Sequence, residues 1–235
     1  MSETTEIKTI NLWENSFILK SAHGVNSYVI KTDTGFVMID TGFHSKRKEL
    51  EMALENIGCK PGNLNLIIIT HGDLDHIGNC AFLQNKFRAI TAIHRGELES
   101  VVNSNMTLNR KKKPAFAAKL LLSFFGTIYK ADRFHPDIFV NDGDNLSNYG
   151  LDAVVFHMPG HSKGSIGILT ADGNLFCGDL LLNINNPSPT DLLDDSADLE
   201  NSIKKLRNLS FHTIYPGHGK SFLREQFFDM IHDRI

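Results

Sequence analysis

Short apolar runs separated by polar turns dominate the first part of the chain. Runs at 17–19, 27–30 and 36–39 are rich in β-branched and aromatic residues, and His23-Gly24 and Asp33-Thr34-Gly35 separate them. This pattern predicts a β-meander. The apolar residues of 45–57 recur at helical spacing and stop at Gly58, which predicts a helix. The uninterrupted apolar run 64–69 predicts a fully buried strand.

The second half of the chain repeats this plan. We expect a helix at 79–87 and a strand at 89–93, then strands at 153–157, 166–170, 174–177 and 213–215 and a helix at 196–209. Strands and helices mixed in two similar halves predict two packed sheets with helices outside. No low-complexity linker divides the chain, so we expect one domain over 1–235.

A segment at about 98–134 interrupts the repeated plan. It contains the basic run 110–113 and then Pro114, which is well placed to open an apolar helical run reaching residue 130. We interpret the basic run as a solvated charged segment rather than a phosphate site. Two main interpretations of the apolar run stay open, plain core or a lid that lines a substrate cleft, with membrane contact as a minor third.

Polar residues with metal-binding side chains gather directly after the predicted strand 64–69. The sequence there reads Thr-His-Gly-Asp-Leu-Asp-His, and the candidate ligands in it are His71, Asp73, Asp75 and His76. In extended backbone alternate residues project to one side, so the first three can converge, and a turn brings in His76. Imidazole together with carboxylate suits zinc, iron or manganese.

Three further candidates follow later strand-like runs. They are His161, Asp179 and His218, and a glycine directly precedes each of them. Glycine permits positive φ and close backbone approach. A single His-Gly turn says little, but seven ligand-type residues at strand ends form a joint pattern that predicts a site for two metal ions, where Asp179 could bridge the ions.

This pattern resembles the signature of the metallo-β-lactamase superfamily, HxHxDH followed by a His, a bridging Asp and a final His. The element Asp40-Thr41-Gly42 also matches the family. The resemblance spans about residues 27–218 and is closest in layout to the compact glyoxalase II-like hydrolases. It implies an αββα sandwich of two mixed β-sheets flanked by helices, with the site in a cleft at one edge.

The resemblance also implies how the ligands divide between the two ions. His71, position 73 and His161 would hold the first ion, Asp75, His76 and His218 the second, and Asp179 would bridge. Asp40 would orient a ligand, a role that metal sites require in general. We expect two divalent ions, zinc first, with iron or manganese as alternatives.

Asp73 stands where the family has histidine. It could ligate through oxygen, lie outside the ligand set or leave the first position weakly occupied. Two ions carry +4, and a bridging hydroxide with Asp75 and Asp179 brings −3, so an ionised, ligating Asp73 would make the site neutral. On that count we expect lower Lewis acidity and a preference for harder metals such as iron or manganese.

The expected activity is hydrolysis. Two ions about 3.5–4 Å apart lower the pKa of a bridging water to about 7 and polarise a carbonyl or phosphoryl oxygen. We expect Asp75 to orient the resulting hydroxide and Asp73 to belong to the catalytic centre. Substrate classes are small-molecule esters, thioesters, lactones and phosphodiesters.

The main alternative belongs to another class. Flavodiiron proteins share the implied fold and look like HxExDH, with an acidic residue where Asp73 stands. The alternative is therefore a non-haem di-iron protein that binds or reduces oxygen. A metal-poor binding protein is a third possibility, which the near-complete ligand set argues against.

Composition restricts the setting. The formal charge of −3 gives no electrostatic support for nucleic acid or anionic membrane as a partner. Cys59, Cys80 and Cys177 are too few and too far apart for a disulfide framework, and we expect Cys177 to be a core thiol rather than a ligand. With no apolar signal segment and no apolar stretch long enough for a membrane span, we expect a cytoplasmic protein.

Overall fold

Two β-sheets form the centre of the computed structural model, which describes residues 6–12, 24–111 and 131–230. The first sheet has its strands in chain order: β1 (Ile7–Leu12), β2 (Val25–Thr32), β3 (Gly35–Ile39), β4 (Leu64–Ile68), β5 (Ile90–His94) and β6 (Ile138–Val140). The second and third predicted runs pair antiparallel as β2 and β3, β1 was not predicted and pairs antiparallel with β2, and β3 to β6 run parallel. Run 17–19 lies outside the described residues.

The second sheet is built from the later part of the chain. Its order is β13 (Phe222–Leu223), β12 (Thr213–Pro216), β9 (Asn174–Gly178), β8 (Ile166–Thr170) and β7 (Ala153–His157). β12 lies parallel to β9, and the other pairs are antiparallel, so this sheet is also mixed. A small hairpin of β10 (Leu181–Asn183) and β11 (Pro187–Pro189) follows β9.

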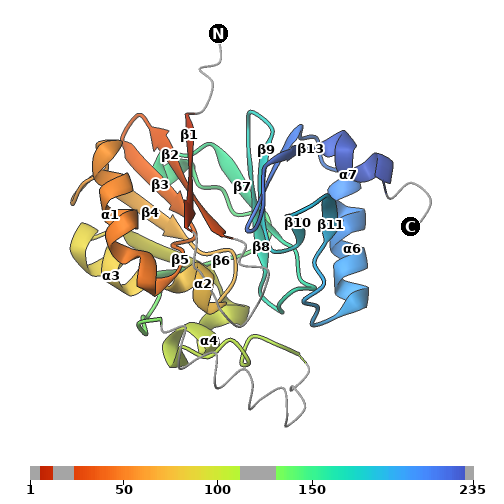
Figure 1. Cartoon of the computed structure of the whole chain (residues 1–235), viewed down its shortest axis with the longest axis horizontal. Helices are drawn as coiled ribbons and strands as arrows, with labels where there is room; N and C mark the ends of the chain where they lie inside the picture. The colour runs from red at the N-terminus through yellow and green to blue at the C-terminus, as the bar shows by residue number, and fades with distance from the viewer. Residues whose placement is uncertain (1–5, 13–23, 112–130, 231–235) are drawn as a thin grey trace.

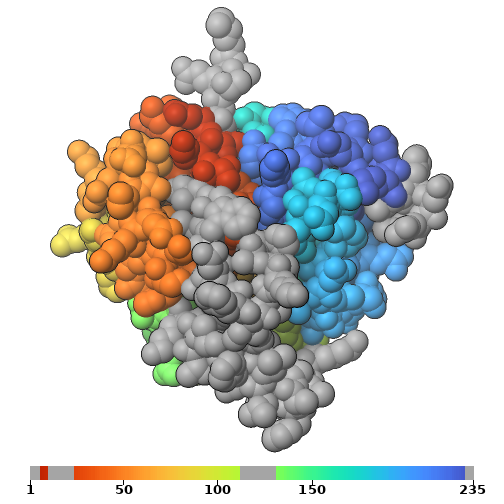
Figure 2. Space-filling model, viewed as in Figure 1, coloured from red at the N-terminus to blue at the C-terminus, as the bar shows by residue number. Residues whose placement is uncertain are grey.

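Helices cover the outer faces of both sheets (Figure 1). The longer ones are α1 (Arg47–Asn56) and α3 (Cys80–Phe87) on the first sheet and α6 (Ser196–Arg207) and α7 (Arg224–Met230) on the second. Short helices lie at connections: η1 (His44–Lys46), α2 (Leu74–Ile77), η2 (Arg95–Glu97), α4 (Leu98–Asn103) and η3 (Ser147–Tyr149). Figure 2 shows the first half (red to orange) and the second half (cyan to blue) on opposite sides of the molecule.

Alternation along the strands produces these layers. Ile30, Leu66 and Ile68 face inward and pack with Ile168 and Phe176 of the second sheet in one buried cluster. The alternate residues of the first sheet point outward to α1 and α3. A third cluster lies between the second sheet and helices α6 and α7. Burying apolar side chains on both faces of a sheet is the main stabilising contribution in such a fold, and the predicted αββα sandwich is confirmed.

The insertion at 98–134 is described only in part. It begins with α4, but residues 112–130, including the predicted apolar helix, lie outside the described residues. The lid interpretation and the single-domain boundaries therefore remain predictions.

Candidate metal centre

The ligand loop begins where β4 ends, at the edge where the two sheets meet. After Ile68 the chain passes through Thr70 and His71 to Asp73, which lies one residue before α2. His71 is 1% exposed, Asp73 3% and His76 0%. The extended backbone of Asp73 followed by the turn of α2 brings His76 back to His71, with the two ring centroids 4.0 Å apart.

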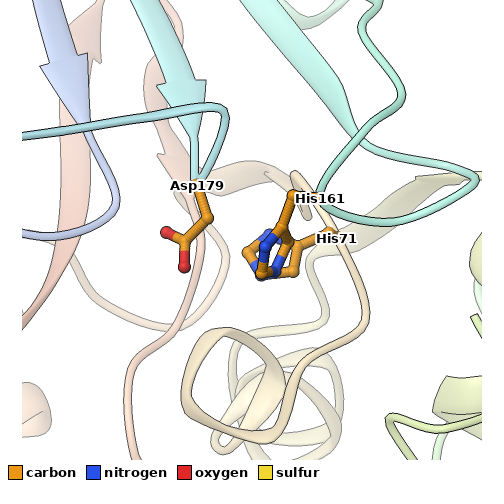
Figure 3. Close-up of side chains that lie close together, drawn as sticks. All are labelled: His71, His161 and Asp179. Atoms are coloured by element: carbon orange, nitrogen blue, oxygen red, sulfur yellow. The ribbon is translucent and has the colours of Figure 1, made fainter. Parts of the chain in front are cut away.

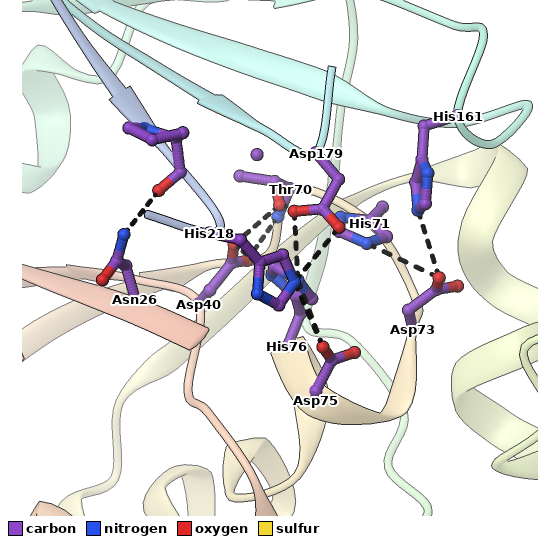
Figure 4. Close-up of polar contacts among 12 residues, drawn as sticks. Asn26, Asp40, Thr70, His71, Asp73, Asp75, His76, His161, Asp179 and His218 are labelled. Atoms are coloured by element: carbon purple, nitrogen blue, oxygen red, sulfur yellow. Dashed lines mark hydrogen bonds and ion pairs between the residues drawn. The ribbon is translucent and has the colours of Figure 1, made fainter. Parts of the chain in front are cut away.

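Asp40 fixes the orientation of this loop from the end of β3. One of its carboxylate oxygens accepts a hydrogen bond from the Thr70 backbone N–H at 2.8 Å. The other accepts from Thr70 Oγ1 at 2.7 Å and lies 2.8 Å from His76 Nδ1. Since Nδ1 of His76 is engaged, its Nε2 points into the centre (Figure 4). The expected orienting role of Asp40 is consistent with this geometry.

Two sets of three candidate ligands converge at the site. The first contains His71, His161 and Asp179 (Figure 3), and the second contains Asp75, His76 and His218. Within each set the nearest ligand atoms lie within 4.8 Å of one another.

Asp179 lies between the two sets. Its Oδ1 is 3.4 Å from His76 Nε2 and its Oδ2 is 3.3 Å from His218 Nε2, while His218 Nε2 is also 3.3 Å from Asp75 Oδ2. Both of these contacts are to histidines of the second set, while Asp179 itself belongs to the first set, whose ligand atoms lie within 4.8 Å of one another. The carboxylate thus contacts both sets, as a bridging ligand would (Figure 4).

The donor atoms fit bound metal. Among the described residues, His71 Nε2, His76 Nε2 and Asp179 Oδ1 are buried without a hydrogen-bond partner. Buried polar atoms normally have a hydrogen-bond partner. Three buried atoms without one, gathered at one place, are therefore suited to coordinate a metal ion. Imidazole nitrogen and carboxylate oxygen are the donors that zinc and iron accept.

The other ring nitrogens point away from the centre and meet protein oxygens. Nδ1 of His161 lies 2.8 Å from the Leu192 carbonyl, Nδ1 of His218 lies 3.3 Å from the Gly24 carbonyl, and Nδ1 of His71 lies 3.0 Å from Thr70 Oγ1. Such partners hold Nε2 as the inward donor.

Asp73 lies at the rim of the first set. Its Oδ2 is 3.1 Å from His161 Nε2 and 3.8 Å from His71 Nε2, spacings compatible with three ligands around one ion. The same oxygen accepts a 2.6 Å bond from Arg110 Nη2, and Oδ1 accepts a 3.1 Å bond from Asn109 Nδ2.

Arg110 corrects the interpretation of the basic run as solvated. Its side chain is 12% exposed, pairs with Asp73 and donates from Nη1 to the His161 carbonyl at 2.6 Å. Lys111 fits the solvated interpretation, since it is 44% exposed and pairs with Asp198. Residues 112 and 113 lie outside the described residues.

The carboxyl groups of the centre are held in their ionised form. Burial by itself would raise the pKa of Asp73, but the Arg110 guanidinium and the neighbouring imidazoles bring it well below its usual range. The pKa of Asp179 is likewise well below, and that of Asp75 below, their usual values, because His76 and His218 outweigh burial. Desolvation lowers the pKa of His71, which favours the neutral, ligating imidazole.

Two glycines permit the close approach that the sequence suggested. A Cβ at Gly217 would collide with Asp179 Oδ1, and one at Gly178 would collide with the Thr70 side chain. Gly178 also has φ of 52°, which glycine adopts most easily. The backbone before His218 is therefore packed against the candidate ligand Asp179, and the backbone before Asp179 is packed against Thr70, the neighbour of His71.

Sequence reasoning missed Asn109, Arg110 and Glu97. Glu97 is fully buried and accepts hydrogen bonds from the Gly72 and Gly164 backbones and from the Ser162 and Asn109 side chains. In the sequence these are ordinary acidic, amide and basic residues in or beside the insertion, and residues of these types are common on surfaces. Only the fold brings them to the ligands.

The expectation that Cys177 is a core thiol is confirmed, and Tyr28 also packs in the core near the site. Cys177 lies in the outer cluster of the second sheet, no disulfide involves it, and burial raises the pKa of its thiol to about 12. Tyr28 packs on Phe176 and Tyr215 and donates to the Pro216 carbonyl at 2.6 Å. Neither is among the candidate ligand sets.

The fold and the site together define a protein with two adjacent sets of candidate metal ligands at the edge of an αββα sandwich. The family model of the metallo-beta-lactamase superfamily matches residues 21–218. The chain therefore belongs to this superfamily, as the sequence resemblance implies.

The chain is similar in sequence to several curated proteins. The chain is 23% identical over 247 residues to the acyl-coenzyme A thioesterase MBLAC2 of Bos taurus, which covers 95% of this chain and 83% of that protein. It is 24% identical to a beta-lactamase-like protein 2 homolog of Caenorhabditis elegans, of which it spans 56%. A hydroxyacylglutathione hydrolase of Shewanella pealeana is 31% identical over 115 residues, 49% of this chain and 32% of that protein.

Solved structures share the fold. The BLEG-1 B3 metallo-beta-lactamase has a TM-score of 0.71 at 24% identity and covers 95% of this chain and 97% of its own. The di-iron-bound form of TTHA1623 has a TM-score of 0.68 at 23% identity and covers 91% and 94%. Among the described residues, no helix has the length and apolar character to cross a membrane.

Proposed function

We propose that this protein is a metal-dependent hydrolase of acyl thioesters that holds two divalent ions. The observation that supports this most is the convergence of unsatisfied donor atoms from both halves of the chain. In this proposal His71, Asp73 and His161 hold the first ion, Asp75, His76 and His218 hold the second, and Asp179 bridges.

The ions would lower the pKa of a bound water and polarise the acyl carbonyl. The chain supplies the geometry for this chemistry. Both contacts of Asp75 within the described part of the chain use Oδ2, so Oδ1 is left to accept a proton from the attacking water. The Asp75 side chain is 25% exposed, so its carboxylate borders on solvent.

The ionised state of the carboxyl groups of the centre favours a thioester among the possible substrate classes. Asp73, Asp75 and Asp179 all have a pKa below the usual value, so none of them is protonated at neutral pH. A thiolate leaves without a proton because thiols have a pKa near 8.5, whereas an alkoxide needs one. The names of two relatives, a coenzyme A thioesterase and a hydroxyacylglutathione hydrolase, support the same class.

The test combines metal content with a substrate panel. Untagged protein is analysed for metals by mass spectrometry and then assayed for thiol release from acyl-coenzyme A and S-acylglutathione, with oxygen esters, lactones and phosphodiesters in parallel. We expect about two zinc ions per chain and activity on thioesters. Asp179→Asn should reduce activity at least about a hundredfold.

The opposite result is equally clear. Two irons, no turnover of any ester and an optical band that changes between air and argon would replace the hydrolase by the oxygen-reactive alternative. The di-iron neighbour shows that this fold holds iron in one protein, so the elemental analysis comes first. A cytoplasmic location remains a further expectation, tested by fractionation.

A further inference from the structure

The Asp73–Arg110 ion pair is a strong polar contact of the centre that the proposed hydrolase chemistry does not use. Both side chains are largely buried, with 4% and 12% exposure, and Arg110 Nη2 lies 2.6 Å from Asp73 Oδ2. That oxygen is also the one directed at His71 and His161. A guanidinium this close to a prospective ligand atom has to affect how strongly the atom binds a cation.

We propose that Arg110 is a charge-compensating positioning residue for the first metal position. The Asp73–Arg110 pair as a whole carries no net charge, as a neutral imidazole carries none. The carboxylate provides the donor atom, and the guanidinium removes the extra negative charge that the carboxylate brings. This inference rests on the proposed function only in assuming that the site holds metal.

The charge count of the centre then changes. An ionised Asp73 alone would bring two divalent ions, a bridging hydroxide, Asp75 and Asp179 to neutrality. Arg110 adds one positive charge and returns the sum to +1, the value of a centre with histidine at this position. The expected shift toward harder metals is therefore offset, and zinc remains the metal we expect.

Neighbouring hydrogen bonds keep the Asp73 and Arg110 side chains in place. Asn109 Nδ2 donates to Asp73 Oδ1 and at 2.6 Å to Glu97 Oε2, so Asp73 is fixed through both oxygens. Arg110 also donates to the His161 carbonyl, so the same guanidinium contacts both the loop of Asp73 and the loop of His161. With Asn109 in place, loss of Arg110 removes a charge while Asp73 stays supported.

A cycle of variants tests the compensation. Zinc content per chain is measured by mass spectrometry after dialysis against chelator-buffered free zinc, without substrate. In Asp73→His the Arg110 charge is uncompensated, and we expect the free zinc concentration that half-saturates one of the two sites to rise at least about tenfold. In Arg110→Gln the carboxylate is uncompensated, and the same concentration should fall about tenfold. The double variant should return to within about threefold of the native value.

Controls separate charge from structure. Lys111→Gln removes the same charge one residue away, at a side chain that is 44% exposed, and should change zinc binding less than about twofold. Arg110→Lys keeps the charge and should stay near native, and Asp73→Asn should weaken binding as Asp73→His does. Circular dichroism checks that each variant is folded.

The result that overturns the inference has the opposite sign. If Arg110 only braces the loops, Arg110→Gln weakens zinc binding and the double variant is weaker than Asp73→His alone. No substrate enters this experiment, so it can succeed or fail independently of the reaction. If the variants bind zinc as expected but the protein has no thioesterase activity, the proposed reaction is refuted and the inference stands. If the protein hydrolyses thioesters but the effects of the Asp73 and Arg110 substitutions are not coupled, the inference is refuted and the proposed reaction stands.

Discussion

Asp40 shows how a single residue can organise a centre that it does not enter. Its φ of 56° lies in the left-handed region, which residues other than glycine seldom adopt. This backbone directs the carboxylate at the Thr70 N–H, the Thr70 hydroxyl and His76 Nδ1 together. The strained conformation is thus coupled to the orientation of one candidate ligand.

We predict that Asp40→Ala weakens zinc binding at the second position by roughly 10–100-fold, because His76 loses the group that orients its ring. It should also lower the free energy of unfolding of the metal-free protein by about 1–3 kcal/mol through lost buried hydrogen bonds. Zinc titration and urea unfolding measure the two effects. The exposed Asp33 gives the control Asp33→Ala, and equal zinc affinity in both variants would contradict the prediction.

Single residues differ in how far the sequence could reveal them. The seven candidate ligands and Asp40 stand in local motifs, and the structure brings them together. Arg110 stands in a run of four basic residues, a pattern that is usually solvated. Its pairing with Asp73 joins residues 37 positions apart, and no local pattern encodes a contact made only after the insertion folds back on the ligand loop.

At the scale of elements, η2 and α4 connect the two ligand loops. Glu97, the last residue of η2, accepts from Gly72 in the first loop and from Ser162 and Gly164 in the loop that follows His161. A Cβ at Gly72 or Gly164 would collide with the Glu97 side chain or its neighbour Ser100. The residues of η2 and α4 therefore support both loops that carry the candidate histidine ligands of the first set.

We predict that Glu97→Gln lowers the free energy of unfolding by about 1–3 kcal/mol. An amide can accept with only one of its two heavy atoms, so its NH₂ must face a donor such as Gly72 N–H or Gly164 N–H. Denaturant unfolding of metal-free protein measures this. Exposed Glu99 supplies the matched control, and a Glu97→Gln protein as stable as Glu99→Gln would show that the four hydrogen bonds contribute little.

The predictability of elements follows from their burial. β7 and β8 have the predicted bounds because their residues alternate or are apolar throughout, and β9, β12 and α6 differ only at their ends. The strands β1, β6, β10, β11 and β13 were missed. β6, β10, β11 and β13 span only two or three residues, and β1 has apolar residues at three of its six positions without regular alternation. Short strands of this kind exist because a neighbouring strand offers an edge, and that edge is a property of the folded sheet.

At the scale of the molecule, the centre joins the two halves of the chain. The first half supplies Asp75 and His76 and the second supplies Asp179 and His218. The backbones also meet at this seam, since His218 forms an isolated bridge with Val25 of the first sheet. Metal bound here would stabilise the folded chain by linkage, because the unfolded chain offers no such arrangement.

Zinc affinity at the second position should fall as the pH falls. Burial alone would lower the pKa of His218, but Asp179 and Asp75 raise it to about 10 in the metal-free centre, so zinc has to displace a proton at neutral pH. Burial alone would also lower the pKa of His76, but Asp179, Asp40 and Asp75 raise it well above its usual value, so His76 can release a second proton. Each displaced proton changes the affinity about tenfold per pH unit, so we expect binding at least about a hundredfold weaker at pH 6 than at pH 8. Calorimetry in buffers of different ionisation enthalpy measures the released protons. Equal affinity at both values, without proton release, would contradict this reading.

The bridge between Val25 and His218 carries a consequence for the order of events during synthesis. The ligands proposed for the first ion are complete once residue 179 has been made, but the second ion waits for β12 and His218. If the proposed ligands hold two ions, a chain that ends before β12 lacks His218 and therefore lacks one ligand of the second ion. Binding of the proposed second ion would then report that synthesis has passed the last strand of the site.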